Sequence, residues 1–349
     1  MLRRSLLTLL VAVLSGCGDA PTEPVEGRAS EVVYGDDGRR EPADAAPGNA
    51  ALAASVGALI EDGDLRRVAG GRWEVADTVP NLESFFGLCP DERFLEQPTA
   101  GFCSGTLIAE DLVLTAGHCL SASSCRDALF VFDYRWEGDA LGVIEDDDVY
   151  RCADIVARQP PNAIGLDPEY AIFRLDRPAT GRPVATATPE AVRSLAVGDP
   201  LTMLGFPNGL PLKVDAGGRV RSLGSFTFDA TVDAFAGNSG SGVFRGGELV
   251  GVLLGGAPDY VSGDGGACLA VNRLSESASG ETLLYVDSAF DGYCQANPSD
   301  TRLCPTPDAW IVGRLPAGAG GCAAGGPPPG PLVALALALW ARRRGTTGA

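Results

Sequence analysis

The hydrophobic positions of this chain fall into short runs that are separated by turn residues, such as Pro207-Asn208-Gly209 and Gly217-Gly218. No long amphipathic helical pattern dominates the sequence. Short apolar runs bounded by Gly, Pro and Asn are typical of strands. The clearest runs cover residues 105–108, 112–115, 129–132, 171–175, 201–205, 242–244 and 248–254. This spacing predicts an all-β fold with closed sheets.

The first residues have the pattern of an export signal. Arg3 and Arg4 precede an apolar run from Leu6 to Leu14, which is too short for an ordinary membrane span. The run ends in Leu14-Ser15-Gly16-Cys17, which resembles a bacterial lipobox. The resemblance implies cleavage before Cys17 and attachment of lipid to it. The alternative is an ordinary secretory signal that contains an unrelated cysteine.

The other end of the chain carries a second unusual segment. Gly321-Cys322 is followed by a Gly/Pro stretch, an apolar run over residues 331–340, and three arginines at 342–344. This order resembles a myxobacterial C-terminal sorting tail, and the alternative is a low-complexity end. Together the two ends predict an exported protein of the cell envelope or cell surface, anchored in a membrane by the lipid or the tail, or released from it.

Composition narrows the choice of partners. The 349 residues carry a net charge of −18, so nucleic acid is not an expected partner, because phosphate binding needs Lys and Arg patches. The ten cysteines of an exported chain indicate disulfides rather than a zinc site, and the chain has one histidine and no CxxC pair. We expect no metal and no cofactor. Proximity favours Cys125–Cys152 and Cys294–Cys304, although spacing alone does not establish connectivity.

Two segments carry the chemistry. The first runs from Cys103-Ser104-Gly105-Thr106-Leu107-Ile108 to Val113-Leu114-Thr115-Ala116-Gly117-His118-Cys119, and the second is Gly237-Asn238-Ser239-Gly240-Ser241-Gly242. Together they resemble the chymotrypsin-like serine peptidases, in particular the bacterial trypsin-like enzymes related to the glutamyl endopeptidases. The resemblance implies two six-stranded antiparallel β-barrels, roughly at 80–185 and 190–290, with the active site in the cleft between them. It also implies a disulfide between Cys103 and Cys119. If Cys17 and Cys322 are set aside as processing cysteines, this bridge and the two pairs favoured by proximity leave Cys89 for Cys268.

The same resemblance assigns roles to residues. His118 would be the general base, Ser239 the nucleophile, and the backbone N–H groups of Gly237 and Ser239 the oxyanion hole. A serine hydroxyl is a poor nucleophile unless a base lies within hydrogen-bond reach and a third group orients that base. Register places Glu169 at the third position, where relatives carry aspartate. Asp167 is the alternative acid, and a third reading is that neither acid works and the enzyme is impaired.

The sequence says less about the residues that bind the substrate than about the catalytic residues. Asp233 lies six residues before Ser239, where trypsins carry the carboxylate that binds Arg or Lys. The alternative is that Asp233 is structural. Gly255 and Gly256 are expected to form a wide, open pocket wall. The strand that carries them has no histidine, so a glutamate preference is not expected.

These assignments divide the chain into five parts. Residues 1–17 are a lipoprotein-type signal, 18–50 a polar tether or propeptide, and 51–290 a trypsin-like serine protease domain. Residues 291–320 are a cysteine-containing extension and 321–349 a sorting tail. The predicted function is an exported serine endopeptidase that acts on proteins or peptides. The alternative is a catalytically impaired protease fold that binds a peptide or protein at the cell surface.

Overall fold

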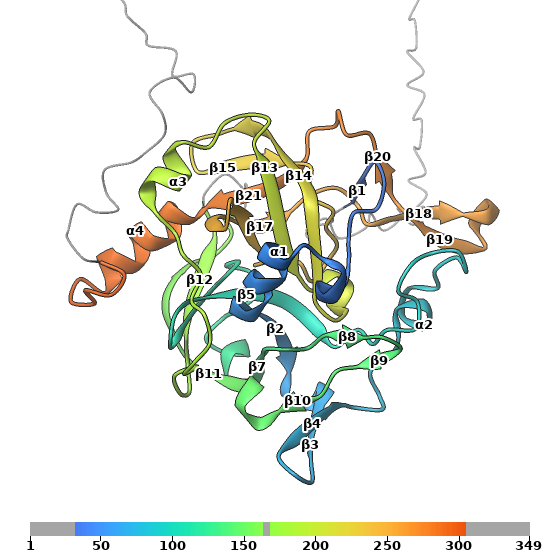
Figure 1. Ribbon diagram of the computed structural model, residues 1–349, viewed down its shortest axis with the longest axis horizontal. Helices are drawn as coiled ribbons and strands as arrows, with labels where there is room; N and C mark the ends of the chain where they lie inside the picture. The colour runs from blue at the N-terminus through green and yellow to red at the C-terminus, as the bar shows by residue number, and fades with distance from the viewer. Residues whose placement is uncertain (1–31, 163–167, 305–349) are drawn as a thin grey trace, which may run out of the picture.

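The computed structural model describes residues 32–162 and 168–304. Its main body consists of two closed β-barrels of six strands each, which lie one above the other in Figure 1. The first barrel has the order β11-β12-β6-β5-β2-β7 and the second the order β13-β14-β15-β21-β17-β16. The paired strands of both barrels are antiparallel, as the sequence predicted.

The first barrel is formed by β2 (Val56–Glu61), β5 (Gly101–Ala109), β6 (Leu112–Thr115), β7 (Ala128–Val131), β11 (Val149–Gln159) and β12 (Tyr170–Leu175). It therefore starts well before the expected residue 80, because β2 supplies a strand that pairs with both β5 and β7. The second barrel is formed by β13 (Pro200–Gly205), β14 (Lys213–Leu223), β15 (Thr227–Ala230), β16 (Gly242–Arg245), β17 (Glu248–Gly255) and β21 (Glu281–Tyr285).

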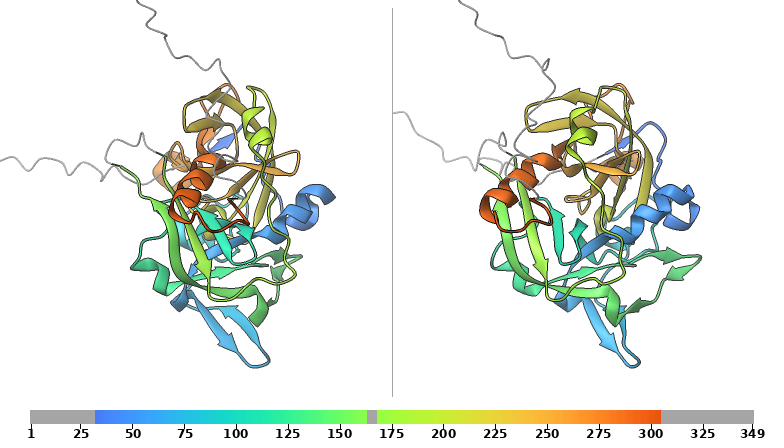
Figure 2. Two further views of the ribbon diagram at one scale, coloured as in Figure 1. Left: turned by 90° about the vertical axis from the view of Figure 1, so that its left-hand side faces the viewer. Right: turned by 60° about the vertical axis from the view of Figure 1, so that its left-hand side comes forward.

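Smaller elements decorate the barrels. Among the short sheets outside the barrels, one has three strands, β3 (Leu65–Val68), β4 (Arg72–Val75) and β10 (Ile144–Glu145). Two others have two strands each: β8 (Trp136–Glu137) pairs with β9 (Ala140–Leu141), and β18 (Tyr260–Gly263) pairs with β19 (Cys268–Val271). Another two-stranded sheet belongs to the N-terminal segment described below. The longer helices are α1 (Pro47–Leu52), α2 (Leu82–Phe86), α3 (Pro189–Arg193) and α4 (Val286–Ala296). In both views of Figure 2, α4 lies beside β11 and β12 of the first barrel, so the helix that follows the second barrel reaches back to the first.

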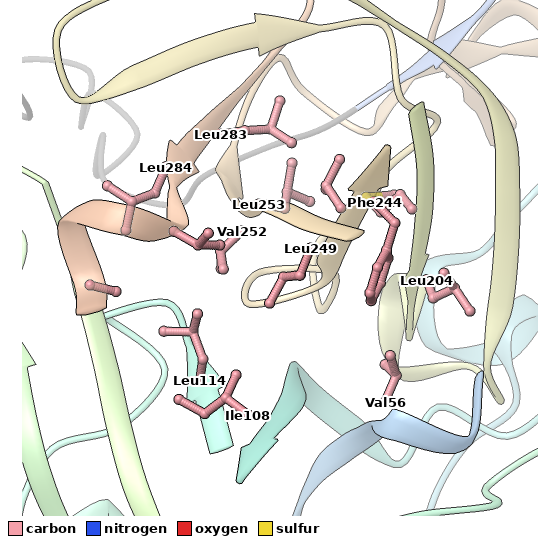
Figure 3. Close-up of a cluster of buried hydrophobic side chains, with 14 of the residues drawn as sticks. Val56, Ile108, Leu114, Leu204, Phe244, Leu249, Val252, Leu253, Leu283 and Leu284 are labelled. Atoms are coloured by element: carbon pink, nitrogen blue, oxygen red, sulfur yellow. The ribbon is translucent and has the colours of Figure 1, made fainter. Parts of the chain in front are cut away.

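One large cluster of buried apolar side chains contains residues from both barrels. Figure 3 shows Val56, Ile108 and Leu114 of the first barrel close to side chains of the second, including Leu249 and Phe244. All five are almost completely buried. Burial of this kind stabilises by about 25 cal/mol for each Å² of apolar surface. The shared core fixes the two barrels relative to each other, and with them the loops that meet at their junction.

The segment before the first barrel is folded rather than a free tether. Residues 32–40, which we call the N-terminal strap, include β1 (Val33–Tyr34), and β1 pairs with β20 (Arg273–Leu274). Val32 and Val33 are fully buried, and the backbone of Arg40 exchanges hydrogen bonds with Val214. Part of the stretch expected to be a tether (18–50) thus packs on the second barrel, because two adjacent valines and the strap backbone find partners there.

Four disulfides join the described chain: Cys89–Cys268, Cys103–Cys119, Cys125–Cys152 and Cys294–Cys304. These are the pairs expected from the sequence. Cys17, Cys322 and the apolar C-terminal run lie outside the described residues. Within the described ranges, no helix is both long enough and apolar enough to cross a membrane.

Candidate active site

His118 lies in a tight turn directly after β6. The backbone N–H of Cys119 donates to Ala116 across this turn, and the disulfide to Cys103 ties the turn to β5 with a Cα–Cα distance of 6.0 Å. The Arg158 side chain donates to the carbonyl oxygen of Gly117 at 3.0 Å. The turn is therefore fixed on both sides, while a third of the His118 side chain stays exposed.

Glu169 is brought to His118 by strand register. It directly precedes β12, and β12 pairs with β6 so that Ala171 lies opposite Thr115. The Oε1 atom of Glu169 lies 2.7 Å from Nδ1 of His118, and the Glu169 side chain is 12% exposed. A carboxylate only accepts hydrogen bonds, so in the neutral imidazole the proton belongs on Nδ1, and Nε2 is then an acceptor. Asp167, the other acid considered, lies outside the described residues.

Ser239 is held against the first barrel by its backbone. Its carbonyl oxygen accepts a hydrogen bond from the N–H of Ser104 at 2.8 Å, and Sγ of Cys119, the residue after His118, contacts the same oxygen at 3.5 Å. The backbone of Ser239 therefore lies against the turn that carries His118. The Ser239 hydroxyl donates to the carbonyl of Leu254 at 3.5 Å, and among the described residues it makes no hydrogen bond to His118.

The glycines beside Ser239 are required by close packing. Gly237 and Gly240 have φ values of 94° and 87°, in the region that favours glycine. A Cβ atom on Gly237 would lie 2.7 Å from the carbonyl oxygen of Phe206, and one on Gly240 would lie 2.1 Å from that of Ser104. Both turns would be strained by any side chain.

This backbone leaves two amide groups available. The N–H of Asn238 donates to Phe235 and that of Gly240 donates to Leu253. Within the described part of the chain, the N–H groups of Gly237 and Ser239 have no backbone acceptor. Two backbone donors of this kind, at Ser239 itself and two residues before it, are what the predicted oxyanion hole requires.

Residues 103–252 match the family model described as "Trypsin-like peptidase domain". The chain contains a trypsin-like peptidase domain. No curated protein matches the chain.

Two solved structures illustrate the likeness. A Glu endopeptidase in complex with MPD has 19% identity, with 70% of this chain and 94% of that chain covered and a TM-score of 0.42. The VesB protease of Vibrio cholerae has 16% identity, with 76% and 65% of the two chains covered and a TM-score of 0.44.

Asp233 is an internal anchor in this peptidase domain. Its two carboxylate oxygens accept hydrogen bonds from the N–H groups of Tyr34 at 2.8 Å and Gly38 at 2.6 Å, both in the N-terminal strap. Its own N–H donates to Asp215, and Asp233 is 4% exposed. Burial, and next the charge of Asp215, raise the pKa of Asp233 to about 7. This geometry favours the structural alternative over the expected role in binding a cationic substrate side chain.

The N-terminal strap also packs directly on the segment that leads to Ser239 in the peptidase domain. The N–H of Ala234 donates to Val32, and Val33 packs with Phe235 in a small apolar cluster. The guanidinium of Arg39 stacks over the Phe235 ring at 4.0 Å from its centre and pairs with Asp37. The segment just before Gly237 and Ser239 is therefore held in place by residues about 200 positions earlier in the chain.

Gly255 ends β17, and Gly256, which follows it, is exposed. The sequence predicted an open wall here, but the carboxylate of Glu281, the first residue of β21, lies against Gly256. Nothing in the local sequence around Glu281 marks it, because the contact arises only from the pairing of β17 with β21.

The described residues include two groupings of side chains that could in principle ligate a metal, Cys103 with His118 and Cys119, and Cys89 with Asp264 and Cys268. In each grouping both cysteines are joined in a disulfide, so neither supplies a thiolate ligand.

Proposed function

We propose that this trypsin-like peptidase is an exported serine endopeptidase that uses a Ser239-His118-Glu169 triad and an acyl-enzyme intermediate. The observation that carries the proposal is the 2.7 Å contact between Glu169 Oε1 and His118 Nδ1. This contact leaves Nε2 unprotonated and able to accept the proton of a serine hydroxyl. Its substrates are proteins or peptides.

The chemistry needs only groups of this chain and water. Nε2 of His118 takes the proton of Ser239 as Oγ attacks the carbonyl carbon of the scissile peptide bond. The N–H groups of Gly237 and Ser239 hold the resulting oxyanion. The imidazolium then protonates the leaving nitrogen, the C–N bond breaks, and an acyl-enzyme remains. Water, deprotonated by the same imidazole, releases the acid and restores Ser239.

The hydroxyl of Ser239 must turn for this reaction, since it donates to Leu254. A rotation about the Cα–Cβ bond is a small rearrangement, and catalytic hydrogen bonds are often loose without substrate. The same orientation is the observation that favours the second candidate, a protease fold that binds peptides without cleaving them.

Labelling by a fluorophosphonate probe separates the two candidates. The intact protein should be labelled, Ser239→Ala should not, and Ser262→Ala, which removes an exposed serine from β18, should label like the intact protein. Labelled protein that also cleaves a mixed peptide library supports the peptidase. A folded protein that takes up no probe would refute it and leave the binding module.

Export and anchoring are supported in different ways. Four disulfides are typical of a protein that folds in an oxidising compartment. Attachment through lipid on Cys17, or retention through the C-terminal tail, rests on the sequence. Cys17→Ser should release the protein into the medium or leave the signal uncleaved. A mature N-terminus well downstream of Cys17, with no lipid-bearing peptide in mass spectrometry, would exclude the lipid anchor. The proposed domain limits of 51–290 can be tested by limited proteolysis.

A further inference from the structure

The space beside Gly256 is filled by a side chain from a neighbouring strand. A Cβ atom built on Gly256 would lie 1.3 Å from Oε2 of Glu281 and 2.1 Å from its carboxyl carbon. No residue other than glycine fits at position 256 while Glu281 holds this position. The glycine does not open the wall, because its missing side chain is replaced by the Glu281 carboxylate.

Glu281 is held in this position from several sides. Its Oε1 atom accepts a hydrogen bond from the Tyr34 hydroxyl at 2.8 Å, and the backbone N–H groups of Val32 and Ala257 face the carboxylate. Its backbone lies in β21, between β15 and β17. Glu281 is completely buried, and Tyr34 and Val32 are at most 6% exposed.

Glu281, held by the strap, therefore occupies the space that a side chain on Gly256 would need. Asp233, which the family resemblance suggested as a substrate-binding carboxylate, is also buried and bonded to the strap. Burial raises the pKa of the Glu281 carboxyl to about 8. Near neutral pH it is then largely uncharged, which lowers the cost of keeping it buried as a filler.

We propose that Glu281, backed by Tyr34, limits the depth of the primary substrate pocket beside Gly255 and Gly256, so that the enzyme cleaves after small residues such as Gly, Ala and Ser. The proposal rests on the peptidase function proposed above and on the assignment of the two glycines to the pocket wall. Glu281 is a specificity-determining residue in this account and takes no part in the chemical steps.

The physical reason is steric. In a pocket of fixed depth, one additional methylene changes the specificity ratio by about 10- to 200-fold, because the side chain must displace packed atoms or stay outside. Glu281 is tied to β21 and to Tyr34, so it does not withdraw for a larger substrate without breaking a buried hydrogen bond. Leu, Phe and Lys before the scissile bond should all be disfavoured, whatever their charge.

The test is a set of peptides that differ only in the residue before the scissile bond, which is Ala, Leu, Phe, Lys or Glu. The full chain, Glu281→Ala and Glu281→Gln are compared by kcat/KM, and each is first titrated with a fluorophosphonate to count active Ser239. Gln matches the size of Glu and carries no charge, so it is the matched control. Glu248→Ala removes a glutamate from the far end of β17 and controls for general loss of stability.

We expect the intact enzyme to favour Ala over Leu, Phe and Lys by at least about tenfold. Glu281→Ala should raise kcat/KM for the Leu peptide relative to the Ala peptide by about tenfold or more. Glu281→Gln should keep the preference of the intact enzyme. A preference for Lys that disappears in Glu281→Gln would overturn the proposal, since charge and not size would then decide. Equal cleavage after Phe and Ala by the intact enzyme would overturn it without any variant.

The same experiment distinguishes a wrong role for Glu281 from a wrong assignment of the peptidase function. A protein that is labelled at Ser239 but shows the wrong preference refutes the role of Glu281 alone. A folded protein that is not labelled refutes the peptidase function, and this inference with it.

Discussion

Replacing Glu169 by glutamine tests the pair at the centre of the proposed mechanism. The carboxylate accepts from Nδ1 of His118 at 2.7 Å and should stabilise the imidazolium that forms when Ser239 attacks. The amide introduced by Glu169→Gln would be uncharged, and its NH₂ group could donate to the imidazole and favour the wrong tautomer. The fold should persist, because the two side chains have nearly the same shape.

The size of the effect follows from the distance. At an effective dielectric constant of about 20, two unit charges 2.7 Å apart attract by about 6 kcal/mol. A third of the His118 side chain is exposed, so water screens part of this attraction. A remaining loss of about 4–5.5 kcal/mol in the transition state corresponds to a fall in kcat of about 10³- to 10⁴-fold.

The assay is kcat on a peptide substrate, with the thermal midpoint of unfolding as a check on the fold. Glu169→Asp should give an intermediate loss, because the shorter side chain withdraws the carboxylate by about 1.5 Å, one C–C bond. Asp167→Asn is the matched control and should leave turnover nearly unchanged. If Asp167→Asn abolishes turnover while Glu169→Gln does not, the assignment of the acid, and the reasoning from this contact, is refuted.

Three further predictions concern the frame around the site. The double variant Cys103→Ser/Cys119→Ser opens a link across 16 positions and should cost about 3 kcal/mol of unfolding free energy as well as slowing turnover. Opening Cys294–Cys304 in the same way should lower stability without changing kcat, and equal kinetic losses would argue against a special role for the bridge beside His118. Gly237→Ala should slow fluorophosphonate labelling of Ser239 strongly, because the new Cβ would lie 2.7 Å from the Phe206 carbonyl oxygen; unchanged labelling would count against the oxyanion assignment. The raised pKa of Asp233, about 7, means that the folded protein binds a proton more tightly than the unfolded chain, so this group makes stability fall as pH rises from about 4 to 7. Denaturant unfolding across that range should show the fall, and Asp233→Asn should reduce its slope; an unchanged slope would mean that another group, such as Glu281, controls it.

The sequence by itself determined the fold class and several strands. The predicted runs at 112–115 and 201–205 lie within β6 and β13. They could be found because short apolar runs bounded by turn residues reflect local backbone preferences. Strand β2 was not predicted. Its residues are buried on both faces, so it shows no alternation, and a short apolar run of this kind does not reveal its partner. The two segments that contain His118 and Ser239 could be found because each places its characteristic residues within a few consecutive positions.

Only the tertiary structure shows which residues far apart in the sequence contact one another. The family resemblance named Glu169 as the acid partner of His118 and left Asp167 as an alternative, whereas the contact itself depends on the register of β12 against β6. Asp233 occupies the position of a substrate-binding carboxylate, yet its oxygens are taken by the backbone of a strap about 200 residues earlier. Glu281 meets Gly256 only because β17 and β21 are adjacent in a closed barrel. Local sequence encodes backbone conformation, whereas burial and hydrogen-bond partners arise when strands distant in the chain are brought together.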